Sequence, residues 1–160
     1  MLQKESLSEA KKLISENHSI DTSEFFPNIG EEVGVLEIPK IDAELPIIEG
    51  TDEEELDKGV GHYKSTAFPN QNDQILLSGH RDTVFRRMGE LEIGDILTVH
   101  VPYGEFSYEI VETRIVSADD RTVIKSTAPD EVLTVSTCYP FNYIGSAPDR
   151  YIINALPIKQ

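Results

Sequence analysis

The stretch "LTVSTCYPFNYIGSAPDRYII", residues 133–153, joins two strand-like runs through a connection rich in turn residues. Its first half alternates apolar side chains with small polar ones, and this period of two predicts a β-strand. Cys138 is the only cysteine of the chain and ends that strand, on the face opposite the apolar side chains. If the runs 132–138 and 150–158 pair, Arg150 comes next to Cys138.

The same pattern of short strand-like runs and turn residues extends over most of the chain outside this stretch. From Val33 onward, short apolar or alternating runs are separated by turn residues, which predicts seven or eight short strands in an all-β domain. The pattern fits either a closed barrel or a sandwich. The runs are "VGVLEIP", "AELPII", "DQILLSG", "DILTVHVP", "FSYEIVETRIVSA", "EVLTVSTC" and "RYIINALPI".

The N-terminal part differs from the rest. Residues 2–16 place apolar side chains at helical spacings and predict a short amphipathic helix. Residues 17–32 mix polar residues with Pro and Gly, so we expect a linker or wrapping arm. The expected organisation is a helix with an arm over residues 1–32 and one β-domain over residues 33–160.

Two short helices are expected inside the β-domain. "DEEELDKG" and "TVFRRMGEL" each contain a glycine, Gly59 and Gly89, at a place that fits the end of a helix. The acidic run Asp52–Glu55 is interpreted as the solvated first turn of the first of these helices, although carboxylates of this kind could also bind a cation.

Composition excludes several classes of protein. The net charge of −15, from 29 acidic against 14 basic residues, argues against a nucleic-acid surface and suits a soluble domain that stays monomeric. One cysteine excludes an internal disulfide and a cysteine-rich zinc site. No run reaches the roughly 18 apolar residues that a membrane span requires.

A single cysteine beside histidines raises the question of a nucleophile, because a reactive thiol needs a neighbouring base or cation. His18 lies in the arm, and His100 alternates with valines on the outer face of a strand. His62, in the glycine-flanked "GVGHY", suits a structural or pocket-lining role in a loop. His80 directly follows the apolar strand "ILLSG", so a rigid strand end would position it, as it would Cys138.

Acyl chemistry also needs a donor for the oxyanion that forms when a carbonyl is attacked. Arg150 opens the last strand twelve positions after Cys138 and stays charged, although a surface ion pair with Asp149 would explain it equally well. Thr137, next to the thiol, is either a further donor or a β-branched strand residue.

Taken together, the ordered motifs resemble the sortases, the cysteine transpeptidases of Gram-positive cell surfaces, and are most similar to class D. The resemblance runs from about Val33 to Pro157 and depends on the order and spacing of its motifs. These are "GVGHY" at 59–63, "LLSGHRDTVF" at 76–85, "LEIGDILTV" at 91–99 and "VSTCYPFNYIGSAPDRYII" at 135–153.

The resemblance implies an eight-stranded β-barrel that cleaves a Leu-Pro-x-Thr-Gly-like sorting signal after its Thr. Cys138 would attack the Thr carbonyl, His80 would act as acid and base, and Arg150 would bind the substrate and its oxyanion. His62 and Thr137 would contribute to substrate binding. The stretch 117–131 would hold the Leu-Pro part of the signal.

The resemblance also implies partners and a location. The acyl group would pass to an amine of a peptidoglycan precursor or to a pilin lysine, at the outer face of a Gram-positive membrane. Family members usually carry an N-terminal anchor, so we expect this chain to be the soluble part of a longer protein. No cofactor is expected; calcium stimulation is known in the family, but its acidic ligands cannot be assigned here. The Asp-Pro-aromatic lid of pilin-building class C enzymes is missing, which weakens the case for pilus assembly.

Two alternatives stay open at this point. A non-catalytic acidic β-domain could act as a surface binding module with Cys138 merely buried. A cysteine peptidase would release the same acyl group to water.

Overall fold

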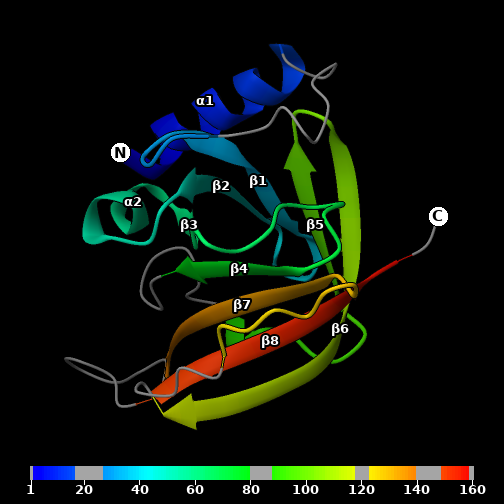
Figure 1. The fold of residues 1–160 in the computed structure, drawn as a ribbon. Helices are drawn as coiled ribbons and strands as arrows, with labels where there is room; N and C mark the ends of the chain where they lie inside the picture. The colour runs from blue at the N-terminus through cyan, green and yellow to red at the C-terminus, as the bar shows by residue number, and fades with distance from the viewer. Residues whose placement is uncertain (1, 17–26, 80–87, 118–122, 140–148, 159–160) are drawn as a thin grey trace.

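The computed structural model describes residues 2–16, 27–79, 88–117, 123–139 and 149–158. In these residues the strands form a closed barrel in the order β1-β2-β3-β4-β7-β8-β6-β5, and β5 pairs back to β1 (Figure 1). The predicted eight-stranded barrel is therefore confirmed. Its elements are α1 (Leu2–Glu16), β1 (Glu32–Ile38), η2 (Pro39–Ile41), β2 (Ala43–Glu49), α2 (Glu53–Lys58), β3 (Val60–His62), β4 (Gln74–Gly79), η3 (Met88–Glu90), β5 (Ile96–Val101), β6 (Gly104–Ser117), β7 (Val132–Tyr139) and β8 (Asp149–Pro157).

Most neighbouring strands are antiparallel, but β2 with β3 and β4 with β7 are parallel. Parallel neighbours need a connection that returns the chain to the starting edge of the sheet. Helix α2 lies in the connection between β2 and β3, whereas β5, β6 and residues 118–131 separate β4 from β7. The second connection brings segments far apart in sequence side by side, as the green and orange strands of Figure 1 show.

The barrel interior holds one apolar core. Leu36, Leu77, Leu97 and Leu133 come from four different strands, and all are fully buried there. Each such side chain contributes roughly 1.5–3 kcal/mol through burial. The alternating runs predicted this, because every second residue of a strand faces the same side.

The helices lie outside the barrel. Helix α1 has the predicted bounds and packs on β1 and β2 with Ala10 fully buried (Figure 1). Helix α2 is also confirmed: Asp52 caps its start and Gly59 its end. Glu55 differs from the prediction of a wholly solvated acidic turn, because it is buried and its carboxylate accepts from the Asp52 backbone N–H at 3.1 Å.

One local prediction is wrong, and another differs from the structure at its end. His62 is the last residue of β3 rather than part of a loop, because "GVGH" pairs with both β2 and β4. Gly61 permits this pairing, since a Cβ there would lie 2.4 Å from the Gly50 carbonyl oxygen. In the run 83–91, residues up to 87 lie outside the described part, and the described end is a single 3₁₀ turn that contains Gly89 instead of stopping at it. The domain boundary at residues 32 and 33 stays a prediction.

At the end of the barrel where β7 begins, one carboxylate joins two segments of the chain. Glu131 accepts from the backbone N–H groups of Asn70 (2.8 Å) and Asn72 (3.2 Å) and from the Tyr108 hydroxyl (2.5 Å). Asn70 and Asn72 have left-handed backbone angles, which Asn tolerates better than most residues. The β3–β4 connection is thereby joined to the strand β6. Burial, together with the bond to Glu131, raises the pKa of Tyr108 far above its usual range.

We expect the free energy of unfolding to fall as pH rises above 10, the ordinary tyrosine pKa, because the unfolded chain then ionises a group that stays protonated in the fold. Below that pH the contribution of Tyr108 is fully present. Tyr108→Phe should lose about 1–2 kcal/mol at neutral pH through its hydrogen bond, yet show a shallower decline between about pH 9 and pH 11. Urea unfolding across that range measures both effects, and an unchanged slope would contradict the assignment.

Candidate active site

Strands β7 and β8 bring two of the predicted site residues together. In their antiparallel register the Cα of Cys138 faces the Cα of Arg150, and the neighbouring pair is Thr137 with Tyr151. The predicted pairing of these two runs is therefore present. The Arg150 side chain is half-buried, and its guanidinium donates to the Asp149 carbonyl oxygen at 3.2 Å rather than to the Asp149 carboxylate.

Strand β4 ends beside the same pair of strands. Gly79, its last residue, faces Thr137 in the parallel register with β7. His80 follows directly in the sequence, and it lies outside the described residues. The backbone therefore brings the residue before His80 opposite the residue before Cys138, although 58 positions separate the two in the chain.

Thr137 has a buried hydroxyl for which the described residues provide no partner. Its side chain is 3% exposed, and its Oγ1 makes no hydrogen bond within the described part of the chain. Most buried polar atoms in proteins are hydrogen-bonded, so an orphan next to a candidate nucleophile needs an explanation.

His62 occupies a different environment from the one predicted. It is 1% exposed and stacks on Phe68 with ring centroids 4.1 Å apart. Its Nδ1 lies 2.7 Å from Glu49 Oε1, and its Nε2 lies 2.7 Å from the Ala67 carbonyl oxygen. A carbonyl oxygen only accepts, so Nε2 carries hydrogen and a second proton lies between Nδ1 and Glu49. The ring thus joins β2 to the β3–β4 connection from inside the protein.

A second set of polar contacts fixes residues 123–131, the described part of the connection between β6 and β7, which we call the crossover segment. The side-chain amide of Gln74 donates to the Val123 carbonyl (2.7 Å) and accepts from the Lys125 N–H (3.0 Å). Asp73 Oδ1 accepts from the Thr127 N–H and the Ser126 hydroxyl, both at 2.9 Å. The side-chain amide of Gln74 thus makes the two hydrogen bonds that the backbone of a neighbouring strand would make.

An apolar contact accompanies these bonds. Val123 packs on Leu76 of β4 and Ile152 of β8, with Tyr63 and Val116 at the margin. The crossover segment therefore lies against the outer face of the barrel near the paired positions 138 and 150. Sequence reasoning placed 117–131 near a substrate but missed Gln74 and Asp73, since nothing in "NDQILL" distinguishes them from an ordinary strand start.

No other chemistry is assigned in the described residues. They contain no group of three or more His, Cys, Asp or Glu side chains placed to hold a metal ion, so no calcium ligand is assigned. Among the helices the structure describes, none is long and apolar enough to cross a bilayer.

His100 lies on the outer face of β5 as predicted, half-buried, with its Nε2 2.9 Å from Glu37 Oε1.

The Asp73 carboxylate should release the crossover segment in acid. Hydrogen bonds from the N–H groups of Gln74 and Thr127 and from the Ser126 hydroxyl hold the pKa of Asp73 below its ordinary 3.8. The contribution of the Asp73 carboxylate to the stability of the crossover segment is complete above pH 3.8. It is lost as the pH falls through the lowered pKa that Asp73 has in the folded protein. We expect hydrogen exchange at Thr127 to accelerate between about pH 5 and pH 3 relative to a core amide such as Val135, after correction for intrinsic exchange. Asp73→Asn should remove this dependence, and equal acceleration in that variant would contradict the assignment.

The buried His62–Glu49 pair should show strong coupling. Removing one partner leaves the other uncompensated in the interior, so His62→Ala and Glu49→Ala should each cost about 3 kcal/mol of folding free energy. The double variant should cost clearly less than the sum, because no unpaired charge remains. Urea unfolding of the four proteins measures the coupling, and additive losses would show that the pair is not coupled.

Comparison with known proteins agrees with this arrangement. A family model described as "Sortase domain" matches residues 36–158. Sortase D of Bacillus subtilis (strain 168) is 57% identical over 139 residues, which cover 87% of this chain and 70% of that protein.

Solved structures extend the comparison to the fold. A Clostridium perfringens Sortase D5 transpeptidase superposes with a TM-score of 0.84 at 28% identity and covers 99% of both chains. A C. perfringens sortase C described with the C-terminal cell wall sorting motif has a TM-score of 0.76 at 23% identity, over 99% of this chain and 92% of that one, and supports the fold alone. The resemblance to class D sortases is confirmed, and it favours an enzyme over a non-catalytic binding module. The barrel, the ordered motifs along β4, β7 and β8 and these relatives agree: the chain belongs to the sortase family of transpeptidases.

Proposed function

We propose that this sortase cleaves a Leu-Pro-x-Thr-Gly-like sorting signal between Thr and the next residue and transfers the acyl group to an amine. The observation that carries the proposal is the register that sets Cys138 opposite Arg150 on β7 and β8, with β4 ending one residue before His80 alongside them. Nucleophile, base and oxyanion donor are the three groups that such an acyl transfer requires.

The first half-reaction forms a thioester. The Cys138 thiolate attacks the Thr carbonyl carbon, and the electron pair of the carbonyl moves to oxygen. The Arg150 guanidinium stabilises this oxyanion. As the tetrahedral intermediate collapses, the C–N bond breaks and His80 gives a proton to the departing amine.

The second half-reaction reverses these roles. An acceptor amine attacks the thioester carbonyl, His80 takes its proton, and the thiolate leaves as the new amide forms. Splitting the exchange into two steps lets an amine compete with water for the acyl group. The acceptor we propose is an amine of a peptidoglycan precursor; a pilin lysine is the other amine that the chemistry admits.

Two further residues support binding in this proposal. The Thr137 hydroxyl, which has no described partner, would bond the intermediate or the substrate backbone beside Cys138. His62 would act through the β3–β4 connection that it holds at Ala67, because its own ring is buried. The enzyme would work as a monomer at the outer face of a Gram-positive membrane.

The decisive experiment follows both products by mass spectrometry. A peptide containing Leu-Pro-Gln-Thr-Gly-Gly is incubated with the enzyme, with and without triglycine or diaminopimelic acid as acceptor. We expect cleavage after Thr and an amide with the acceptor; release of the free acid alone in both samples would show a hydrolase. Cys138→Ala should be inactive but folded, and cleavage at the wild-type rate in that variant would exclude the nucleophile.

Arg150→Lys tests the oxyanion donor. Lysine keeps the charge and loses the planar fork, so kcat should fall by about 100-fold or more with unchanged thermal unfolding. The matched control is Arg114→Lys on β6, which makes the same change on a different strand of the same sheet and should retain activity. Equal losses in the two variants would show a general charge effect rather than a specific role for Arg150.

A further inference from the structure

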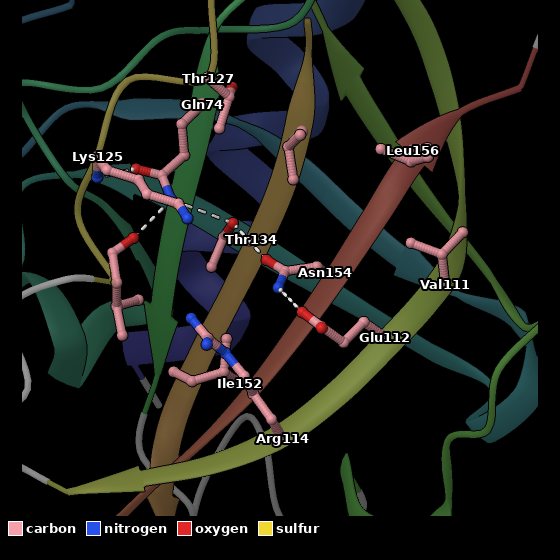
Figure 2. A pocket seen from close by; sticks show the side chains of 12 residues that line it. Gln74, Val111, Glu112, Arg114, Lys125, Thr127, Thr134, Ile152, Asn154 and Leu156 are labelled. Atoms are coloured by element: carbon pink, nitrogen blue, oxygen red, sulfur yellow. Dashed lines mark hydrogen bonds between the residues drawn. The ribbon is translucent and has the colours of Figure 1, made fainter.

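The outer face of β4, β7, β8 and β6 contains a crevice of about 500 Å³ (Figure 2). The crossover segment forms one of its sides. We call it the outer crevice, and its central polar residues are Gln74, Glu112, Arg114, Lys125, Thr134 and Asn154.

The strand register places the outer crevice relative to the proposed nucleophile. Counting back along β7 from the Cys138–Arg150 pair, the next pairs on the same face of the sheet are Ser136 with Ile152 and then Thr134 with Asn154. On β6, Arg114 faces Ile152 and Glu112 faces Asn154. Since a strand rises about 3.3 Å per residue, the Thr134–Asn154 pair lies roughly 13 Å from the Cys138–Arg150 pair.

A substrate has one direction in which this sheet supports it. Cys138 is the last residue but one of β7, and Arg150 is the second of β8, so the described sheet continues only toward Thr134 and Asn154. An extended peptide whose Thr carbonyl meets Cys138 covers about 13 Å between that Thr and the residue before its Leu. That residue therefore reaches the outer crevice.

The floor of the outer crevice is already ordered by its own hydrogen bonds. Gln74 Nε2 donates to Thr134 Oγ1 (3.3 Å), which donates to Asn154 Oδ1 (2.8 Å), and Asn154 Nδ2 donates to Glu112 Oε1 (2.7 Å). Figure 2 shows this chain crossing the four strands. Gln74 and Thr134 are 4% and 1% exposed, so the polar floor is rigid before any ligand arrives.

The two cations of the outer crevice are available to a ligand. Arg114 extends from β6 over β8, and Lys125 lies on the crossover segment at the other side (Figure 2). Both are exposed, and no hydrogen bond or ion pair joins the Arg114 guanidinium to another described residue. The outer crevice also contains one negative charge, the carboxylate of Glu112, which accepts a hydrogen bond from the Asn154 side chain. The lining thus carries two positive charges and one negative in a chain of net charge −15, which favours an acidic partner here.

We propose that the outer crevice binds the residues immediately before the sorting motif and prefers acidic side chains there, through Arg114 and Lys125. This inference rests on the proposed function, because it takes the position of the cleaved bond at Cys138. Through the outer crevice the enzyme would recognise residues outside the motif that it cleaves.

The test compares three peptides in kcat/KM: acetyl-Leu-Pro-Gln-Thr-Gly-Gly, the same peptide preceded by Asp-Glu, and the same peptide preceded by Lys-Lys. The wild type should process the Asp-Glu peptide about fivefold better than the Lys-Lys peptide. Arg114→Glu should abolish or invert this preference and leave the short peptide within about twofold. Arg114→Gln should give an intermediate preference. Lys12→Glu, which makes the same charge change on α1, is the matched control and should behave as the wild type.

Three results would overturn the proposal. One is no difference between the two extended peptides with the wild type, and another is an equal loss with all three peptides in Arg114→Glu. The third is an Arg114 effect on the acceptor's half-saturating concentration alone, which would assign the outer crevice to the amine substrate. Failure of the wild type to cleave even the short peptide would instead contradict the proposed function.

Discussion

The parallel pairing of β4 with β7 is the constraint on which the site depends. Two parallel neighbours cannot be joined by a tight turn, so β5, β6 and a long crossover must lie between them in sequence. In return, the end of β4 lies beside the end of β7, and β8 pairs back along β7 from there. Gly79, Cys138 and Arg150 thus share one end of the sheet without any local signal joining them.

The same topology requires the chain to recross the barrel. β6 ends at Ser117, near the end of β7 that carries Cys138, yet β7 begins at Val132 at the opposite end. The crossover must therefore pass over the outer face, where a loop would leave many backbone groups without partners. Gln74 and Asp73 supply these partners through an amide and a carboxylate at the start of β4. Because its backbone groups are hydrogen-bonded in this way, the crossover segment is held as a wall beside the site.

Buried and half-buried polar groups have a consistent role elsewhere in the barrel. Glu131 holds the β3–β4 connection at one end, and His62 with Glu49 holds it near its beginning. Each of these groups has its partners, whereas the Thr137 hydroxyl has none among the described residues. The contrast sets Thr137 apart, since a structural hydroxyl in the same interior is normally bonded.

The sequence by itself determined the elements and the family. Alternation of apolar residues fixes which face of a strand is buried, so β1, β7 and β8 were predicted within a residue or two, and α1 and α2 followed from spacing and from Gly59. The order of the motifs around His80, Cys138 and Arg150 was enough for the resemblance to sortases. Local patterns could not show that His62 belongs to a strand, because three residues are too short for a period and their pairing partners lie elsewhere in the chain. Only the tertiary structure decided that His62 is buried against Glu49, that Gln74 bonds to the crossover segment, and that Arg114 lines the outer crevice. These are contacts between residues 13 to 51 positions apart, or positions set by the register of four strands, and only the closed barrel specifies them.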